Sequence, residues 1–560
     1  MSKVVCFLLH SYRVARSLSL QRRGFFISLL FITIPGFALA QGGSCPSTWT
    51  SIDPNGNSVS IASYAGISSC YYASKSIGND SNAGTSESAP WAHIPGMAGC
   101  KGNCAAVSPS AGEGFILRGG DTWSGSDVGI AWNWLASSSH WNYIGVDPNW
   151  YSGGSWARPI FNMSGAANGY VILGNSSGAG YWWIDNIEIT GMNNAMNGIY
   201  AQGETNIRAS QMYFHGWSHT GNSNNVGFFS QGGSGAVADH NVIDGSDSSK
   251  NTMNGVYSAW SIFKYNYVNY VVSAVLGNTD EVHDNVFQNA VTSADGDHCN
   301  EVFTFSPLSG NYQLIYNNVI AFGTACSGGV NMWFNGNGGT NAAYVGYGFG
   351  NVIYNTSGGN LINIGNHGAG NYGTYYIFNN TLDGTNGGCG GTLPSGPYWT
   401  LYEQNNHWIA CGFPPLIPPV GGSLIGACTN ASGSGCNDLV QSLSAANAQG
   451  YTSSETAPFS PVNSCTASTC ATLQAGVNLN GNPVCATLNG VNADAYNACQ
   501  KGGPGGLNYN TSNHTVTNGP SHANNSRPSS GAWDIGAYQF ANSPTPQPAT
   551  NLKTTVAPQN

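Results

Sequence analysis

Three ionisable side chains of different chemistry stand at the same position of a short repeated segment. Asp239, Lys264 and His283 each lie two residues before an Asn, in the segments DHNVID, KYNYVN and HDNVFQ. If these segments are neighbouring β-strands, alternation places the three side chains on the outer face, with ~4.8 Å between rungs. We predict that they line one solvent-facing groove. His283 would accept a proton, Lys264 would stabilise charge, and Asp239 would favour the charged form of Lys264. Asp239 could also join Asp295 or Asp297 in holding Ca²⁺ or in forming a hydrolytic pair of carboxylates.

Aromatic residues continue the same column, as a groove for sugar rings would require. They are Tyr316, Phe349 and Phe378. The prediction depends on register, because a slip of one residue sends a side chain to the opposite face. The alternative interpretation is a solvated ladder of surface residues.

A second polar cluster is the segment DGDHCNE at 295–301. Asp295, Asp297 and Glu301 offer hard oxygen ligands for Ca²⁺, which makes calcium a candidate cofactor, or two carboxylates could act as acid and base in glycoside hydrolysis. We expect Asp297 and His298 to be catalytic and the loop to form a wall of the groove. The alternative is a polar turn whose carboxylates accept backbone N–H bonds. A weaker candidate is the pair of histidines in FHGWSH, His215 and His219.

The elements that must position these residues form a repeat. Nine segments share an Asn or Gln flanked by apolar residues, with spacings of roughly 20 to 35 residues, which is typical of stacked β-coils. The Asn suits a left-handed bend at the strand end, and stacked Asn side chains can bond to one another along the axis. The aligned positions are Asn186, Gln211, Asn241, Asn266, Asn285, Asn318, Asn351, Asn380 and Asn406.

The first 40 residues predict export from the cytoplasm. They contain no Asp or Glu, and Arg22 and Arg23 precede an apolar run that ends at Ala38, Leu39 and Ala40. This is the pattern of a signal peptide with a small-residue cleavage site, and the run is too short for a spanning helix. The segment QRRGFF also admits twin-arginine export, although ordinary secretion is favoured. We expect no transmembrane segment in the mature chain.

Cysteine content and charge agree with an exported protein. Of 15 cysteines, one lies in the signal peptide, which leaves 14 for disulfides in an oxidising compartment. We predict a bond between Cys299 and Cys326. The whole chain has 15 basic and 25 acidic residues. Removal of the signal peptide takes away five of the basic ones, giving 10 − 25 = −15, a charge that excludes nucleic acid as a partner.

Three segments carry a family resemblance. They are YYASKSIGNDSNAGTSESAPW (71–91), FILRGGDTW (115–123) and WDIGAYQF (533–540), and they resemble the opening, the next strand and the close of bacterial proteins of the pectate-lyase-like superfamily. The resemblance implies an all-β, right-handed parallel β-helix solenoid with an N-terminal cap and a Cys-rich C-terminal region. The expected organisation of the chain is a signal peptide (1–40), a strand and cap region (41–110), coils (111–410), C-terminal coils and Cys-rich loops (411–542) and a Pro/Thr-rich tail (543–560).

Two functional hypotheses remain open at this point. The first is an exported carbohydrate-active enzyme, a polysaccharide lyase or a glycoside hydrolase acting on a plant or microbial polysaccharide. The second is a non-catalytic solenoid that binds glycan or serves as a scaffold at the cell surface. The mature chain has only four arginines, which disfavours a lyase with an arginine base. A polysaccharide partner and a monomeric state are expected in either case.

Overall fold

The computed structural model describes residues 42–540, except for 133–135, 167–168, 175–179, 194–195, 202, 218–224, 231–232, 249–252, 259, 293–298, 306–311, 322–328, 335–343, 356–359, 365–372, 386–388, 390–398, 412–422, 426–436, 452–465, 481–482, 504–506 and 519–524. The described residues belong to one compact unit, Ala40–Asn560. Within these ranges no helix combines the length and apolar character needed to cross a membrane. The predicted signal peptide and the C-terminal tail lie outside the described residues.

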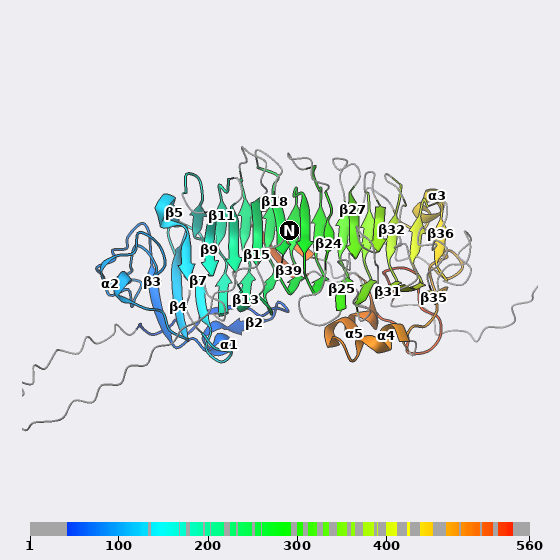
Figure 1. Cartoon of the computed structure of the whole chain (residues 1–560), viewed down its shortest axis with the longest axis horizontal. Coiled ribbons are helices and arrows are strands. Elements are labelled where there is room, and N and C mark those ends of the chain that lie inside the picture. The colour runs from blue at the N-terminus through cyan, green and yellow to red at the C-terminus, as the bar shows by residue number, and fades with distance from the viewer. Residues whose placement is uncertain are drawn as a thin grey trace, which may run out of the picture. The chain divides into compact units, whose positions relative to one another are not determined.

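Three parallel sheets make up the body of the protein, and Figure 1 shows their strands lying side by side. The first, called sheet 1, has 13 strands. It begins inside the region predicted as strand and cap. Its strands are β3 (Ser69–Ala73), β4 (Glu113–Gly119), β7 (Asn142–Tyr151), β10 (Gly180–Asp185), β13 (Thr205–Ser210), β16 (Val237–Asp239), β19 (Ile262–Lys264), β22 (Glu281–His283), β25 (Tyr312–Tyr316), β28 (Val345–Phe349), β31 (Gly373–Phe378), β33 (Trp399–Gln404) and β35 (Ser423–Ile425).

The other two sheets, sheet 2 and sheet 3, have 12 and nine strands. Sheet 2 contains β5 (Thr122–Ser124), β8 (Ile160–Asn162), β11 (Glu188–Thr190), β14 (Tyr213–His215), β17 (Val242–Asp244), β20 (Tyr267–Asn269), β23 (Val286–Gln288), β26 (Val319–Ala321), β29 (Val352–Tyr354), β32 (Thr381–Asp383), β34 (His407–Ile409) and β36 (Leu439–Gln441). Sheet 3 contains β6 (Ile130–Trp132), β9 (Tyr170–Gly174), β12 (Asn197–Ala201), β15 (Asn225–Ser230), β18 (Met253–Ser258), β21 (Ser273–Gly277), β24 (Val302–Thr304), β27 (Val330–Phe334) and β30 (Asn360–Ile364).

The chain visits the three sheets in turn and returns to the first one rung further along. Strands β16, β17 and β18 lie in sheets 1, 2 and 3, and β19 then pairs with β16. Each coil alone is too small to bury an apolar face, so its inward side chains stack on those of the next coil in one continuous core. The predicted all-β parallel β-helix solenoid, which is also the fold implied by the resemblance, is confirmed.

The corner between sheets 1 and 2 is held by seven buried asparagines, one from each of seven successive coils, which we call the asparagine ladder. Each of the first six side-chain amides donates to the side-chain oxygen of the next Asn at 2.9–3.0 Å. The last member also donates its backbone N–H to Asp438 at 2.7 Å. This confirms the predicted stacking along the axis. All seven are fully buried: Asn241, Asn266, Asn285, Asn318, Asn351, Asn380 and Asn406.

The left-handed bend lies one residue earlier than predicted. In the ladder coils the residue before the Asn has positive φ, for example His240 (55°) and Asp284 (55°). In two earlier coils Asn186 and Gln211 themselves take this conformation. The alignment of Gln211 with Asn241 was therefore wrong by one residue, because Ser210 pairs with Asp239. The side chain of Asn241 accepts instead from the backbone N–H of Met212 at 2.9 Å.

We expect Asn318→Leu to destabilise the solenoid strongly. Leucine removes the amide that donates to Asn351 and to the carbonyl of Val282, and it removes the oxygen that accepts from Asn285. Because these partners are buried and have no water to replace the bond, we expect the free energy of unfolding to fall by about 3 kcal/mol or more. Urea unfolding measures the change.

The matched control for this substitution is Asn508→Leu, at an exposed position of the hairpin strand β38 (Leu507–Asn510). We expect this variant to unfold at the wild-type urea concentration. Equal stability of the two variants would show that the ladder does not hold the corner between the sheets.

Segments from both ends of the chain fold back over the outside of the coils. At the N-terminal end these are β1 (Thr50–Ile52), β2 (Ser58–Ser60) and α1 (Ile61–Ala65). The C-terminal part contributes α3 (Leu443–Asn447), α4 (Pro483–Leu488), α5 (Ala493–Cys499), β37 (Lys501–Gly502), β38, β39 (Thr515–Asn518) and β40 (Asn525–Ser526). Figure 1 shows α4 and α5 beside β25 and β31. Two further helical turns are α2 (Gly102–Ala106) and η1 (Gly125–Asp127).

Disulfides support the expectation of an oxidising compartment. Four are described, Cys45–Cys70, Cys100–Cys104, Cys389–Cys411 and Cys485–Cys499. The last joins α4 to α5. Cys299 is also disulfide-bonded, and its predicted partner, Cys326, lies outside the described residues.

Candidate functional site

The three ionisable residues singled out from the sequence occupy neighbouring rungs of sheet 1. Asp239 pairs with Lys264, and Lys264 pairs with His283. The predicted register is therefore correct, and the column continues through Tyr316 as expected. Their side chains point outward as predicted, because Phe263 and Val282, the residues directly before Lys264 and His283, pack in the core.

The predicted exposure of this column is wrong. Asp239 is 0% exposed, Lys264 6% and His283 3%. Segments remote in sequence cover them, and the covering starts at the N-terminal end, where Lys264 Nζ donates to Asn55 Oδ1 at 3.0 Å. The column is therefore no solvent-facing groove.

Asp239 is the centre of a buried ion pair. Its carboxylate accepts from Nε and Nη2 of Arg208, both at 2.8 Å, and it lies 2.8 Å from Nδ1 of His240. Burial by itself raises the pKa of Asp239, but the charge and hydrogen bonds of Arg208 outweigh burial and lower that pKa below its ordinary value. Arg208 in turn lies 4.5 Å from the ring centroid of Trp183. These contacts favour a structural role for Asp239.

His283 is enclosed in the same way. Its Nδ1 lies 2.7 Å from Asp284 Oδ2, and its ring stacks on Tyr316 with 4.4 Å between centroids. Nearby, Glu281 accepts a hydrogen bond from Asn492, next to α5, at 2.7 Å. The side chains needed for proton transfer are present, but the C-terminal segment lies across the approach to them. Catalysis by Asp239, Lys264 and His283 stays a prediction that the geometry does not favour.

The aromatic continuation of the column is also covered. Tyr316, Phe349 and Phe378 are at most 2% exposed, and they pack in one cluster with residues of α4 and α5. Tyr347 in the adjacent column donates its hydroxyl to Thr487 of α4 at 3.0 Å. These rings stabilise the docked helices and do not line a sugar groove.

Most of the second predicted cluster cannot be placed. Asp295, Asp297 and His298 lie outside the described residues. Glu301 is 1% exposed, and burial raises its pKa well above the ordinary value for a glutamate. In the part of the chain that the structure describes, no three His, Cys, Asp or Glu side chains are grouped so as to hold a metal ion. Calcium binding by Asp295, Asp297 and Glu301 therefore stays a prediction.

The weaker histidine candidate is a carboxylate–imidazole–carboxylate cluster on the outside of sheet 2. Nε2 of His215 lies 3.0 Å from Glu188, and Nδ1 lies 2.7 Å from Asp247. The ring also stacks on Tyr213, which stacks on His514 of the C-terminal hairpin. Because both ring nitrogens are occupied, this imidazole anchors the hairpin and does not present a free base. His219 lies outside the described residues.

We expect His215 to make stability depend on pH. Burial lowers the pKa of His215, but the hydrogen bonds and charges of Glu188 and Asp247 outweigh burial and raise that pKa above its ordinary value. A raised histidine pKa gives stability that is complete below the unfolded value, ~6.5, and is lost as pH rises through the folded value. In urea titrations from pH 5.5 to 9, wild type should exceed His215→Gln most at the acidic end.

The control for this titration is Asn508→Leu, a change at an exposed side chain that does not ionise. Its difference from wild type should not vary with pH over the same range. A constant difference for His215→Gln would contradict the assigned charge cluster.

A different face carries half-exposed aromatic side chains, and the sequence analysis missed it. On the outside of sheet 3, Tyr200 pairs with Phe229, and Leu276, Phe303 and Trp333 pair in sequence along β21, β24 and β27. We call these five residues the sheet 3 ladder. All five are half-buried.

The rings of the sheet 3 ladder pack against one another along the sheet. Tyr200 and Phe229 have centroids 4.8 Å apart, and Phe303 stacks on Trp333 at 4.3 Å and 18°. Position 257, a tyrosine, continues the register between Phe229 and Leu276. The next rung after Trp333 is Asn363, so polar amides adjoin the rings. The rings therefore cover each other's faces and turn their edges outward, and together with the neighbouring amide they form an apolar strip beside hydrogen-bonding groups.

Sheet 3 differs from the other two sheets in charge. None of its nine strands contains an Asp, Glu, Lys, Arg or His. Sheet 1 contains Arg208, Asp239 and Lys264, and sheet 2 contains Glu188 and His215. The sheet 3 strands thus give the outer face no charge with which to hold an ionised sugar.

A signal for the sheet 3 ladder was present in the sequence. Segments such as NGIYA, NVGFFS and VNMWF alternate an inward aliphatic or aromatic residue with an outward ring. They lie between the Asn segments, where the connections vary in length, so alignment on the Asn did not bring them into register.

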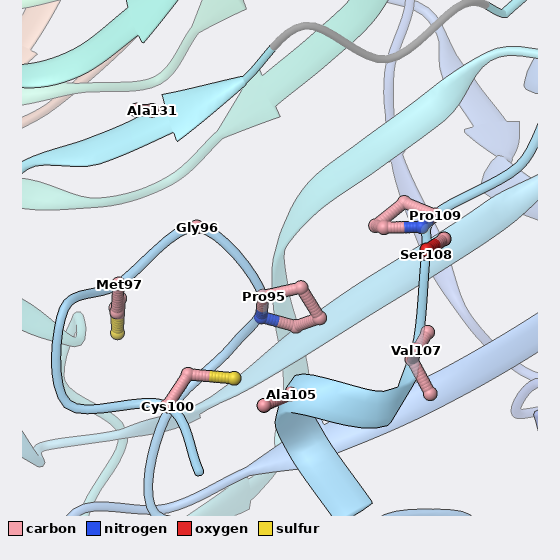
Figure 2. A pocket seen from close by; sticks show the side chains of 9 residues that line it. All are labelled: Pro95, Gly96, Met97, Cys100, Ala105, Val107, Ser108, Pro109 and Ala131. Atoms are coloured by element: carbon pink, nitrogen blue, oxygen red, sulfur yellow. The ribbon is translucent and has the colours of Figure 1, made fainter.

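A pocket of about 280 Å³ lies at the β6 end of sheet 3. Figure 2 shows one loop with Pro95, Gly96, Met97 and Cys100 facing a second stretch of chain, with Ala131 of β6 above. Ala131 pairs with position 173, which pairs with Tyr200, so the pocket adjoins the first rung of the sheet 3 face. Its lining is completed by Ala105, Val107, Ser108 and Pro109.

Comparison with known proteins finds distant structural likenesses. No family model matches the chain, and no curated protein matches it. Among solved structures, pectate lyase Pel9A aligns with a TM-score of 0.41 and 16% identity over 85% of this chain and 98% of that chain. A GH136 lacto-N-biosidase from Eubacterium ramulus aligns with a TM-score of 0.40 and 12% identity over 66% of this chain and 68% of that chain. A rhamnogalacturonan lyase aligns with a TM-score of 0.33 and 16% identity over 66% of this chain and 87% of that chain.

Proposed function

We propose that this protein is an exported carbohydrate-active β-helix protein that binds a neutral polysaccharide along the outer face of sheet 3. One observation carries the proposal, the row of half-exposed rings on strands that hold no charged residue. The apolar C–H surfaces of sugar rings pack on exposed aromatic side chains, and successive units of a glycan can contact successive rungs of this face.

The charge of the face favours a neutral ligand over a uronate polymer. Elimination at a uronic acid requires a cation to neutralise the carboxylate and a base for the C5 proton. The sheet 3 strands supply neither group, and the chain as a whole has a net charge of −10. An acidic polymer would be repelled unless divalent cations intervene. Of the enzyme classes considered, glycoside hydrolysis fits this face better than elimination.

Hydrolysis would need two carboxylates beside the bound glycan. We propose Asp295 and Asp297 for these roles, one as the general acid and one as the base or nucleophile, with His298 as a neighbouring proton carrier. The support is their position in the chain, because they precede β24, which carries Phe303 of the sheet 3 ladder. The second candidate function, glycan binding without catalysis, is favoured by the enclosure of Asp239, Lys264 and His283.

A glycan panel tests the proposal directly. The mature protein, residues 41–560, is titrated with oligosaccharides of cellulose, xylan, mannan and β-1,3-glucan, and with polygalacturonate and alginate, with and without Ca²⁺. We expect binding of at least one neutral oligosaccharide and weaker binding of both acidic ones. New reducing ends would identify a hydrolase, and binding without products would identify a binding protein. Tight binding of only the acidic polymers, or unsaturated uronate products, would refute the proposal.

A further inference from the structure

Two acidic side chains meet inside the last coils of the solenoid. Glu403 of β33 lies in the inward column of sheet 1, because it pairs with Ile377, which packs in the core. Asp438, directly before β36, follows Asn406 along the line of the asparagine ladder. Glu403 is 0% exposed and Asp438 is 8% exposed, and their side chains are in hydrogen-bond contact. Figure 1 shows β36 and α3 at one end of the row of strands.

Asp438 has several hydrogen-bond donors of its own. Its Oδ1 accepts from the backbone N–H of Asn406 at 2.7 Å, and its Oδ2 accepts from the indole of Trp408 at 2.8 Å. The side-chain amide of Asn406 donates to both oxygens at 3.4 Å. These donors favour the ionised form of Asp438. Glu403 must then carry a proton, because two like charges in contact at a buried position cannot both be present without a large cost.

The ionisable groups in the described elements around this pair are neutral or bonded elsewhere. His407 lies 2.8 Å from Gln441, and burial lowers the pKa of His407 to about 4, so it is uncharged near pH 7. Tyr375 points inward from β31, and burial raises its pKa. In the C-terminal segment that covers this corner, Arg527 donates to backbone carbonyls and Asp534 accepts from backbone N–H groups.

We propose that Glu403 and Asp438 share one proton and form a pH-sensitive clasp, which holds the last coil of the solenoid closed in acidic surroundings and loosens it as pH rises. The clasp acts on this coil because Asp438 ties the start of β36 to Asn406 and Trp408 of the coil before it. Loss of the shared proton leaves two buried like charges in contact, and separating them opens the coil to water. The clasp is separate from the proposed glycan face on sheet 3.

The direction of the pH effect follows from proton linkage. Burial raises the pKa of Asp438 to about 7, although its hydrogen bonds lower it. Because the two carboxyls share the proton, this value belongs to the pair. A raised carboxyl pKa gives stability that is complete below the ordinary aspartate value, ~3.9, and is lost as pH rises through the folded value. The opening constant of the last coil should therefore rise by up to about tenfold per pH unit in this window.

Hydrogen exchange followed by mass spectrometry tests the clasp in the mature protein from pH 4.5 to 8, with rates corrected for the intrinsic pH dependence of amide exchange. In peptides that contain β33, β34 and β36, the opening constant should rise by about tenfold or more between pH 4.5 and 7. Peptides that contain β26, in the middle of the solenoid, should show no such rise. An opening constant of the last coil that does not change with pH would overturn the proposal.

Glu403→Gln separates the shared proton from other effects of pH. Glutamine presents an uncharged group of the same shape to Asp438 at every pH, so the opening constant should change by less than about twofold over the same range. Glu403→Leu, which continues the aliphatic column of Ile377, should also remove the rise and serves if the first variant does not fold. The matched control is Asp494→Asn, at an exposed carboxylate of α5, which should retain the wild-type rise. A rise that persists in the folded Glu403 variants would assign it to another group and overturn the clasp.

Discussion

Trp333→Ala is expected to weaken binding of a neutral oligosaccharide by about tenfold or more, and Phe303→Ala by a similar factor. These rings are in stacking contact at 4.3 Å on the outer face of sheet 3. Loss of one ring removes roughly 1.4 kcal/mol of apolar packing from the complex. The effect should appear as an increase in Kd measured by calorimetry with whichever neutral oligosaccharide of the panel binds.

The control is Tyr270→Ala, at a tyrosine that is 37% exposed but follows β20 on sheet 2. It removes a comparable exposed ring from another face and should leave the Kd unchanged. Thermal unfolding of all three variants establishes that the protein is folded. If Tyr270→Ala weakened binding as much as Trp333→Ala did, the glycan site would not lie on sheet 3.

The largest stability effect is expected at the buried ion pair of sheet 1. Arg208→Met leaves the carboxylate of Asp239, which has 0% exposure, without its bidentate partner. Removal of one member of such a pair costs about 3–5 kcal/mol, because the remaining charge stays desolvated. We expect a large drop in the free energy of unfolding at pH 7, measured by urea denaturation.

The double variant Arg208→Met, Asp239→Leu separates the ion pair from simple packing. With both charges gone, we expect it to recover most of the stability lost by Arg208→Met. If the double variant were no more stable than Arg208→Met, the loss would come from packing. The lowered pKa of Asp239 means that its contribution is complete above the ordinary aspartate value, ~3.9, and is lost as pH falls through the folded value.

Asp239→Asn also decides between the two interpretations of this residue. A structural role predicts lower stability with unchanged activity for each folded molecule, in any preparation with measurable turnover. A loss of turnover beyond the loss of folded protein would support the catalytic role predicted from the sequence.

The fold was predictable because the interactions that specify it are formed within a coil or between adjacent coils. Each coil carries its own strand pattern and an Asn at the corner, and the hydrogen bond from Asn285 to Asn318 repeats what the previous coil does. Register along sheet 1 could be deduced from that repeat for Asp239, Lys264 and His283. The deduced register was wrong at Gln211. This residue occupies the left-handed bend but resembles the Asn that follows the bend in later coils, so it was aligned one position too far along.

The location of the open face could not be deduced from the repeat. Outward direction follows from strand alternation, but exposure depends on what covers the strand, and the covering residues are remote in sequence. Asn55 reaches Lys264 across 209 positions, and Asn492 reaches Glu281 across 211. No short-range pattern at Lys264 or Glu281 records these contacts.

The sequence by itself determined the parallel solenoid, the stacking of Asn at one corner and the outward column of sheet 1, because these depend on interactions between adjacent coils of similar sequence. Only the tertiary structure decided that segments from both ends of the chain cover the outward column of sheet 1. It also decided that the rings of sheet 3 remain half-exposed beside a neutral pocket. The physical reason is that burial is a property of all the chain that surrounds a residue, whereas strand alternation is a property of its immediate neighbours.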